Sequence, residues 1–281
     1  MPPNRPGVGT NRSVPGARRL PNTQSRGFRG GAGLRKAARD CARRRGPRPS
    51  GSSRLLRFPD LASVRARPLY HGQTQQKGPQ IPIVQSTTFK YDTSEHMGQL
   101  FDLEASGYFY TRLQNPTNDA VAAKICALEG GAAGMLTSSG QAANFFALFN
   151  ICEAGSHIVA SSAIYGGTYN LIAHTMAKMG VESTFVSPTC TDEELEAAFR
   201  PNTRAVFGET IANPALDVLD IERFAQAAHA HGVPLIVDNT FATPVFCRPF
   251  EWGADIVTHS TTKYMDGHGA GVGGAIVDSG N

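Results

Sequence analysis

The stretch Leu235-Ile236-Val237-Asp238-Asn239-Thr240 is a short apolar run that ends in a carboxylate. A second run, Asp255-Ile256-Val257-Thr258, leads into Ser260-Thr261-Thr262-Lys263. Short, all-apolar runs are typical of strands in a parallel sheet that helices cover on both faces. Because parallel strands release their carboxyl ends at the same edge, we expect Asp238 and Lys263 to face one crevice there.

Segments of strand length and helix length alternate on either side of these runs. The expected strands are residues 133–137, 157–160, 183–186, 205–207, 235–237, 255–258 and 274–277. The expected helices are residues 117–128, 141–150, 168–179, 192–199 and 221–231. This alternation predicts an α/β domain over residues 117–281 with a mostly parallel sheet. Residues 69–116 form an irregular segment, and the chain stops four residues after the last expected strand. We therefore expect a C-terminal domain to be missing.

Charge divides the 281-residue chain into two parts. Residues 1–68 hold 17 basic and two acidic side chains, a net charge of +15, whereas the remainder holds 10 basic and 21 acidic side chains, a net charge of −11. The Arg-, Pro- and Gly-rich tail has too few apolar residues to form a core, so we expect disorder. Its composition is compatible with a transit peptide, with a nucleic-acid-binding arm, or with a translation start that has been assigned too far upstream.

The tail lacks the interleaved aromatic residues of a nucleic-acid-binding segment, so no nucleic-acid partner is expected. No apolar run approaches the ~18 residues that span a bilayer, so no membrane partner is expected either. The sequence favours a cytoplasmic location, or an organellar one if the tail is a transit peptide.

Several motifs at strand ends suit a flat, phosphorylated cofactor. A lysine, a carboxylate and two hydroxyls match the needs of pyridoxal phosphate: Lys263 for a Schiff base, Asp238 for the pyridinium nitrogen, and Ser260 and Thr262 for the phosphate. The alternative is an ordinary ion pair between a surface lysine and a strand-end aspartate. The stretch Thr137-Ser138-Ser139-Gly140-Gln141 joins a strand to a helix, whose free N–H groups favour an anion.

Three further motifs have a functional and a purely structural interpretation. Tyr165 precedes two glycines at a strand–helix junction and could stack on a ring, or it could be a core tyrosine. Asn213 precedes a proline and could bind a phenolic oxygen, or it could belong to a simple turn. Tyr110 and Arg112 lie in the irregular segment, where an arginine is otherwise a solvated loop residue.

Two tempting motifs are rejected. The stretch Gly269-Ala270-Gly271-Val272-Gly273-Gly274 matches the GxGxxG pattern, but a strand rather than a helix is expected after it. His229 and His231 lie two positions apart on an expected helix and diverge, so no metal site is predicted.

Taken in order, these motifs closely resemble the Cys/Met-metabolism family of pyridoxal-phosphate-dependent enzymes over residues 70–281. The stretches at 165–171, 213–222, 239–244 and 277–281 resemble the O-acetylhomoserine sulfhydrylases within that family. The resemblance implies the large domain of the fold type I transferases, similar to aspartate aminotransferase, and a homo-oligomer, either a dimer or a tetramer. It also implies that residues 69–116 contribute to the subunit interface.

The resemblance implies roles residue by residue. Lys263 holds the cofactor and moves protons, Asp238 pairs with the pyridinium nitrogen, and Tyr165 stacks on the ring. The other implied cofactor-binding residues are Ser139, Gly140, Gln141, Asn213, Ser260 and Thr262, with Tyr110 and Arg112 reaching the phosphate of a neighbouring subunit.

The implied activity is replacement of the acetate of O-acetylhomoserine by sulfide or a thiol, which gives homocysteine or methionine. Cystathionine γ-synthase and methionine γ-lyase activities are the alternatives within the family. The family's C-terminal domain supplies an arginine for the substrate carboxylate. A chain without that domain could instead be an inactive, cofactor-binding fragment.

Overall fold

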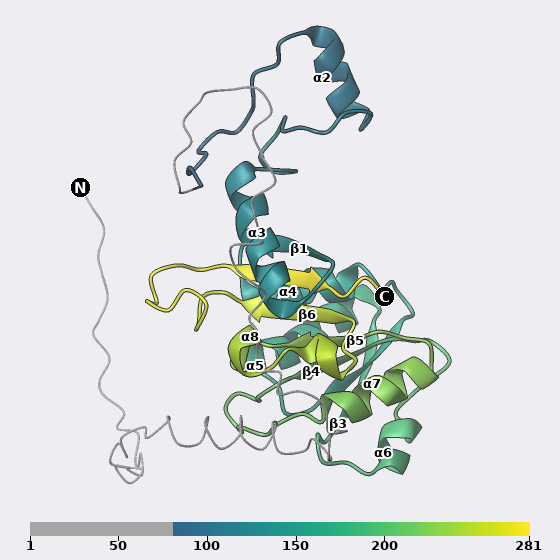
Figure 1. Ribbon diagram of the computed structural model, residues 1–281. Helices are drawn as coiled ribbons and strands as arrows, with labels where there is room; N and C mark the ends of the chain where they lie inside the picture. Colours follow the sequence, from purple (N-terminus) through teal and green to yellow (C-terminus); the bar gives the residue numbers. More distant parts are fainter. Residues whose placement is uncertain (1–80) are drawn as a thin grey trace, which may run out of the picture.

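The computed structural model describes residues 81–281, and the expectations for the tail at 1–68 lie outside the described residues. A seven-stranded sheet with the order β1-β7-β6-β5-β4-β2-β3 forms the centre of the domain (Figure 1). Its strands are β1 Ala133–Thr137, β2 His157–Ser161, β3 Glu182–Val186, β4 Thr203–Glu209, β5 Leu235–Asp238, β6 Ile256–Ser260 and β7 Gly274–Asp278. Each expected strand is present.

The sheet is mostly parallel, as expected. Strands β3, β2, β4, β5 and β6 pair in parallel, whereas β7 lies antiparallel to both of its neighbours, β6 and β1. The register places Glu209 beside Asp238, and Asp238 beside Thr258. Three polar side chains therefore meet near the carboxyl ends of the three central strands.

The helices begin and end near the expected residues. They are α3 Pro116–Glu129, α4 Gly140–Phe149, α5 Gly166–Asn170, α6 Asp192–Ala197, α7 Ile221–Ala230 and α8 Thr243–Phe246. Helix α5 continues as a π-helical turn, η1 Leu171–Met176, and a 3₁₀ turn, η2 Ala177–Met179, and a further 3₁₀ turn, η3, spans Pro249–Trp252. Thr191 and Glu194 form a capping box at the start of α6, and Asp220 caps α7. None of the described helices is long and apolar enough to cross a membrane.

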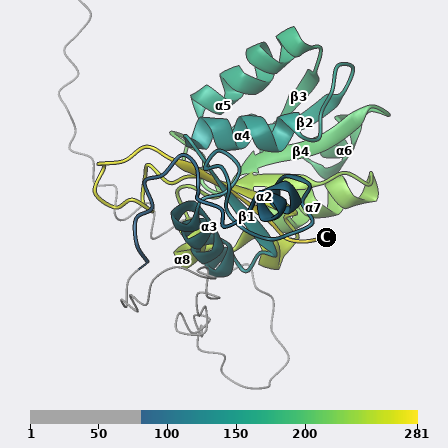
Figure 2. The same ribbon diagram turned by 90° about the horizontal axis from the view of Figure 1, so that it is seen from above.

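Two helical layers cover the sheet. Leu148 of α4 and Ile172 of η1 pack with Phe207 and Ile236 on one face. Phe224 of α7 packs with other residues of β4 and β5 on the opposite face, where α3 also packs against β6 and β7. Figure 2 shows α4 and α5 on one side of the sheet and α3 and α7 on the other. This sandwich leaves the strand ends open for a site.

The segment before α3 projects from the domain as an arm, which we define as residues 81–115 (Figure 1). The arm differs from the irregular segment expected here because it contains one helix, α2 Ser94–Phe101. Thr93 caps this helix by accepting the N–H of His96 at 3.1 Å. Its apolar side chains are unevenly buried: Leu100 is buried, whereas Phe101 is 59% exposed. A helix of eight residues with only three large apolar side chains, Met97, Leu100 and Phe101, gives a weak signal in the sequence.

Candidate active site

Asp238 is a buried carboxylate whose described partners are all neutral. Its side chain is only 7% exposed at the end of β5. Its Oδ1 accepts from the N–H of Thr240 at 3.1 Å and the hydroxyl of Thr240 at 2.5 Å, and its Oδ2 accepts from the Nδ2 of Asn144 at 3.0 Å. Within residues 81–281, no lysine, arginine or histidine forms an ion pair with it. A cation placed beside Oδ2 would compensate this buried charge.

Thr240 links the two strand ends of the site. Its hydroxyl donates to Asp238 and accepts from the N–H of Ser260 at 2.8 Å. One side chain thus fixes the end of β5 relative to the end of β6, as the sequence-based expectation of a common crevice requires.

The first turn of α4 lies directly against Ser260. Ser139 caps the helix by accepting the N–H of Ala142 at 3.1 Å, which leaves the N–H groups of Gly140 and Gln141 pointing out of the helix. A Cβ atom at position 140 would lie 2.4 Å from the Cβ of Ser260, so only glycine allows this approach. The N-terminus of α4, with its partial positive charge, and the Ser260 hydroxyl form a cradle suited to an anion such as phosphate.

Asn144 ties the floor of the site together from the next turn of α4. Besides Asp238, its Nδ2 donates to the Oγ1 of Thr168 at 3.1 Å, and its Oδ1 accepts from the hydroxyl of Thr258 at 2.5 Å. These residues, and Thr240, were not identified from the sequence. Asn144 lies four residues after Gly140, on the same face of α4, which is the signal that could have identified it.

Glu209, at the end of β4, holds the segment that contains Tyr165. Its carboxylate accepts the N–H of Tyr165 at 2.6 Å and also a hydrogen bond from the backbone of Asn213. Burial and the nearby charge of Asp238 raise the pKa of Glu209 to about 8. Tyr165 itself is 51% exposed at the mouth of the site, and its ring packs beside Gly167. The sequence indicated Tyr165 and Asn213, but it gave no role to Glu209.

Glu209→Gln is expected to flatten the dependence of stability on pH. The folded state holds a proton between pH 4.5 and about 8 that the unfolded state has lost, so stability falls as pH rises through this window. In the cofactor-free wild type, this loss should reach ~2 kcal/mol or more, or roughly 4 °C in Tm. Thermal unfolding at pH 5 and pH 8 measures the difference. Glu153→Gln, an exposed control, should behave like the wild type, and an equally steep fall in Glu209→Gln would contradict the prediction.

Lys263 follows β6 in an exposed turn. Its backbone N–H donates to the carbonyl of Ser260 at 3.3 Å, which places the lysine one turn beyond the cradle. Thr262 exchanges hydrogen bonds with the backbone of Gly273: its hydroxyl donates to the carbonyl at 3.2 Å and accepts from the N–H at 3.1 Å. This contact ties the lysine turn to the start of β7. Phosphate binding by Thr262 stays a prediction.

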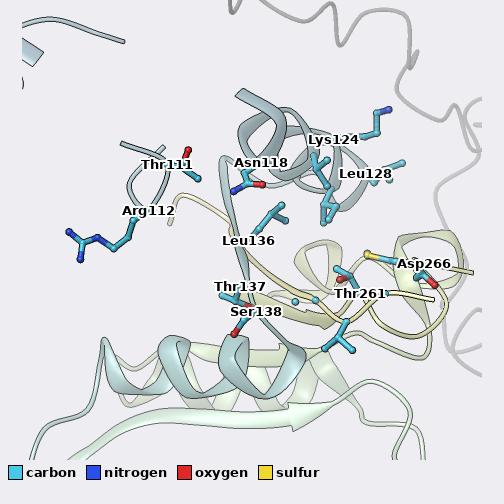
Figure 3. A pocket seen from close by; sticks show the side chains of 17 residues that line it. Thr111, Arg112, Asn118, Lys124, Leu128, Leu136, Thr137, Ser138, Thr261 and Asp266 are labelled. Atoms are coloured by element: carbon cyan, nitrogen blue, oxygen red, sulfur yellow. The ribbon is translucent and has the colours of Figure 1, made fainter. Parts of the chain in front are cut away.

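Tyr110 and Arg112 lie in the arm rather than beside Asp238. The guanidinium of Arg112 sits 5.1 Å from the centre of the Tyr110 ring. Arg112 also lines a cavity of about 790 Å³ between α3, β1 and the loop after β6. Figure 3 shows its side chain extending away from the other lining residues. The cavity also reaches Ser138, next to the cradle, but the Arg112 side chain extends away from it.

Comparison with known proteins reveals a clear relationship. Residues 64–281 match the family described as Cys/Met metabolism PLP-dependent enzyme. The chain belongs to this family. The match begins a few residues before position 70, where the sequence motifs placed it.

Individual members of the Cys/Met-metabolism family resemble the chain closely. An O-acetyl-L-homoserine sulfhydrylase of Corynebacterium glutamicum is 46% identical over 224 residues, covering 79% of this chain and 51% of that protein. An L-methionine gamma-lyase of Porphyromonas gingivalis is 48% identical over 197 residues, covering 70% of this chain and 49% of that protein. The chain thus spans about half the length of these relatives.

A solved structure confirms the fold. A Campylobacter jejuni protein assigned as an O-acetylhomoserine (thiol)-lyase superposes with a TM-score of 0.72 at 36% identity, covering 76% of this chain and 52% of that one. That structure contains N'-pyridoxyl-lysine-5'-monophosphate. The large-domain fold of the fold type I enzymes expected from the sequence is therefore confirmed.

The site geometry fits the cofactor of this family. Pyridoxal phosphate has a pyridinium cation at one end and a phosphate at the other. Asp238 is a buried carboxylate with no cationic partner in the described part of the chain, and Thr240 joins it to an anion cradle at Gly140 and Ser260. Opposite charges of the ligand thus meet complementary groups at two linked positions.

Proposed function

We propose that this chain is the cofactor-binding part of an enzyme that replaces the acetate of O-acetylhomoserine by sulfide or a thiol. The products are acetate and homocysteine, or methionine when the thiol is methanethiol. The C–O bond at Cγ of the substrate breaks and a C–S bond forms there. The observation that carries the proposal is Asp238, a buried carboxylate that has no cationic partner among the described residues and lies beside an anion cradle. The name of the Corynebacterium relative supports the choice of substrate.

Each side chain of the site is proposed to bind a different part of the cofactor. When bound, pyridoxal phosphate supplies an electron sink for charge that develops on the substrate. Asp238 would hold the proton on the pyridinium nitrogen, because its negative charge favours the charged form of that ring. The N-terminus of α4 and Ser260 would bind the phosphate, and Tyr165 and Asn213 would hold the ring.

Lys263 is proposed to attach the cofactor and to move protons at Cα and Cβ of the substrate. A lysine must lose its proton before it can act as a nucleophile or a base, and a neighbouring cationic ring favours the neutral amine. Support for this role comes from its position, because Lys263 follows β6, which pairs in parallel with the strand that ends at Asp238.

We further propose that the active form is at least a dimer. The arm projects from its own domain with Tyr110 and Arg112 on it, and it exposes large apolar side chains, including Leu103 at 83% and Leu113 at 61%. Exposed apolar surface of this kind favours association with another chain. In a dimer, the arm of one chain would bring Arg112 to the phosphate of the other.

Two measurements, made one after the other, test the proposed activity. Pyridoxal phosphate binding, followed by visible absorbance, comes first. O-acetylhomoserine is then supplied with sulfide, methanethiol or cysteine, and homocysteine, methionine, cystathionine and 2-oxobutyrate are quantified. Homocysteine or methionine as the main product is the expected result, and a chain that binds no cofactor would contradict the proposal.

The second candidate is a γ-lyase, because the Porphyromonas relative is as similar as the sulfhydrylase. Mostly 2-oxobutyrate in the same assay would favour the lyase, and mostly cystathionine would favour a cystathionine γ-synthase. Cofactor binding without turnover of any donor would identify a cofactor-binding fragment.

A further inference from the structure

Glu129 and His259 form a buried pair that has no role in the function proposed above. Glu129 is the last residue of α3, and His259 lies in β6 directly before Ser260. The Nε2 of His259 is 2.5 Å from the Oε1 of Glu129, and both side chains are fully buried. The pair therefore joins a helix on one face of the sheet to the strand that carries the phosphate end of the site.

The same carboxylate oxygen also holds the other strand end. The Nδ2 of Asn239, the residue after Asp238, donates to the Oε1 of Glu129 at 2.9 Å. A single oxygen of Glu129 is thus bound to the neighbour of Asp238 and to the neighbour of Ser260. The Oδ1 of Asn239 accepts in turn from the hydroxyl of Thr210 at 2.9 Å, which fixes the orientation of the amide.

Burying the Glu129–His259 pair costs folding free energy. Among residues 81–281, the Oε2 of Glu129 and the Nδ1 of His259 find no hydrogen-bond partner. A buried carboxylate loses its hydration, and well-packed apolar side chains often give equal or greater stability at such positions. An arrangement that leaves two buried polar atoms unpaired does not maximise stability, which indicates that its value lies in the geometry it imposes.

We propose that Glu129 is a positioning residue that sets the spacing between Asp238 and Ser260. Thr240 links the two strand ends on the side of the ligand, and Glu129 links their neighbours Asn239 and His259 from α3. The inference rests on the proposed function, because Asp238 and Ser260 are the residues that would bind the two ends of pyridoxal phosphate. A fixed spacing would let one rigid ligand satisfy both.

The test compares two cavity-forming variants. Glu129→Ala removes the shared oxygen, whereas Leu195→Ala creates a cavity at a buried position of α6, on a different element of the core. Hydrogen exchange of the backbone N–H groups of Asn239 and Ser260 is measured in the cofactor-free proteins. Titration with pyridoxal phosphate then gives the affinity for the cofactor and the visible circular dichroism of the bound form. Urea unfolding shows how much stability each variant loses.

Glu129→Ala is expected to speed hydrogen exchange at both backbone N–H groups by at least about tenfold. A change of this size corresponds to the free energy of one hydrogen bond to a charged group. The same variant should weaken cofactor affinity by about tenfold and change the visible circular dichroism at saturation. Leu195→Ala should leave the dichroism and the affinity unchanged. If Glu129→Ala matches Leu195→Ala in all of these readouts, the proposal is wrong.

A further single variant, His259→Leu, covers the case in which Glu129→Ala does not fold. His259→Leu keeps a similar volume and removes one contact, so it should speed exchange at Ser260 more than at Asn239. If His259→Leu exchanges both backbone N–H groups at the same rates as the wild type, the proposal is wrong. Where both single variants fold, backbone exchange in the double variant should be no faster than in Glu129→Ala alone. The reason is that both changes break the same contact between Glu129 and His259.

The exchange measurement needs no cofactor, so it separates the two hypotheses. A wild-type chain that fails to bind pyridoxal phosphate would contradict the proposed function, while the exchange rates would still decide whether Glu129 fixes the strand ends. A wild-type chain that binds the cofactor, beside a Glu129→Ala variant with unchanged exchange and affinity, would overturn the positioning role alone.

Discussion

Lys263→Ala is expected to abolish the visible absorbance that a lysine-bound pyridoxal group gives, and to abolish turnover. No other side chain of the described site has an amine that can form a Schiff base with the cofactor aldehyde. The cofactor can still bind through Asp238 and the cradle at Gly140, so affinity should fall less than activity. Absorbance of the purified variant with added pyridoxal phosphate measures the effect.

Reduction with borohydride identifies the attachment directly. In the wild type, the mass of the cofactor should appear on the peptide that contains Lys263, and in the variant on no peptide. Lys178→Ala, at an exposed lysine in η2, is the matched control and should retain the absorbance. An unchanged visible band in Lys263→Ala would overturn the assignment of this residue.

Asp238→Asn is expected to weaken cofactor binding by more than a hundredfold. The carboxylate is 7% exposed, and breaking a buried charge pair costs at least ~3 kcal/mol, where each 1.4 kcal/mol is tenfold in affinity. The asparagine keeps the size of the side chain, so the fold should remain. Turnover should fall further than affinity, because a neutral ring is a weaker electron sink.

Titration with pyridoxal phosphate measures this affinity, with Asp217→Asn as an exposed control. The same variant provides an internal check on the charge of the site. Asp238 is one cause of the raised pKa of Glu209, so that pKa should move down in Asp238→Asn. A variant with wild-type affinity and full activity would contradict the role of Asp238.

Local patterns in the sequence were sufficient for most of the fold. The apolar runs that became β2, β4 and β5 are buried on both faces, and the capping residues Thr191 and Asp220 mark the starts of α6 and α7. Helix α2 was missed because its eight residues include only three large apolar side chains. The π-helical turn at Leu171–Met176 was also missed, since only packing against the sheet shows where a helix changes its winding.

The site was predictable where it follows strand ends and obscure where it depends on distant contacts. Asp238 and Ser260 could be placed at one edge because parallel strands end together. Glu129 and Asn144 could not, because each meets these strands more than 90 positions away along the chain. Hydrogen bonds across such separations leave no periodic pattern in the sequence.

Because β7 pairs with both β1 and β6, we expect the anion cradle to be completed late in folding. Strand β1 pairs only with β7 within the described sheet, and Thr137 lies opposite Gly274. Gly274 also packs against Ser139, where an added Cβ would lie 2.2 Å from the carbonyl oxygen. Contacts of such long range form slowly. During synthesis, α4 can form early, but its first turn acquires its final surroundings only after residues 274–278 have emerged from the ribosome and inserted between β1 and β6.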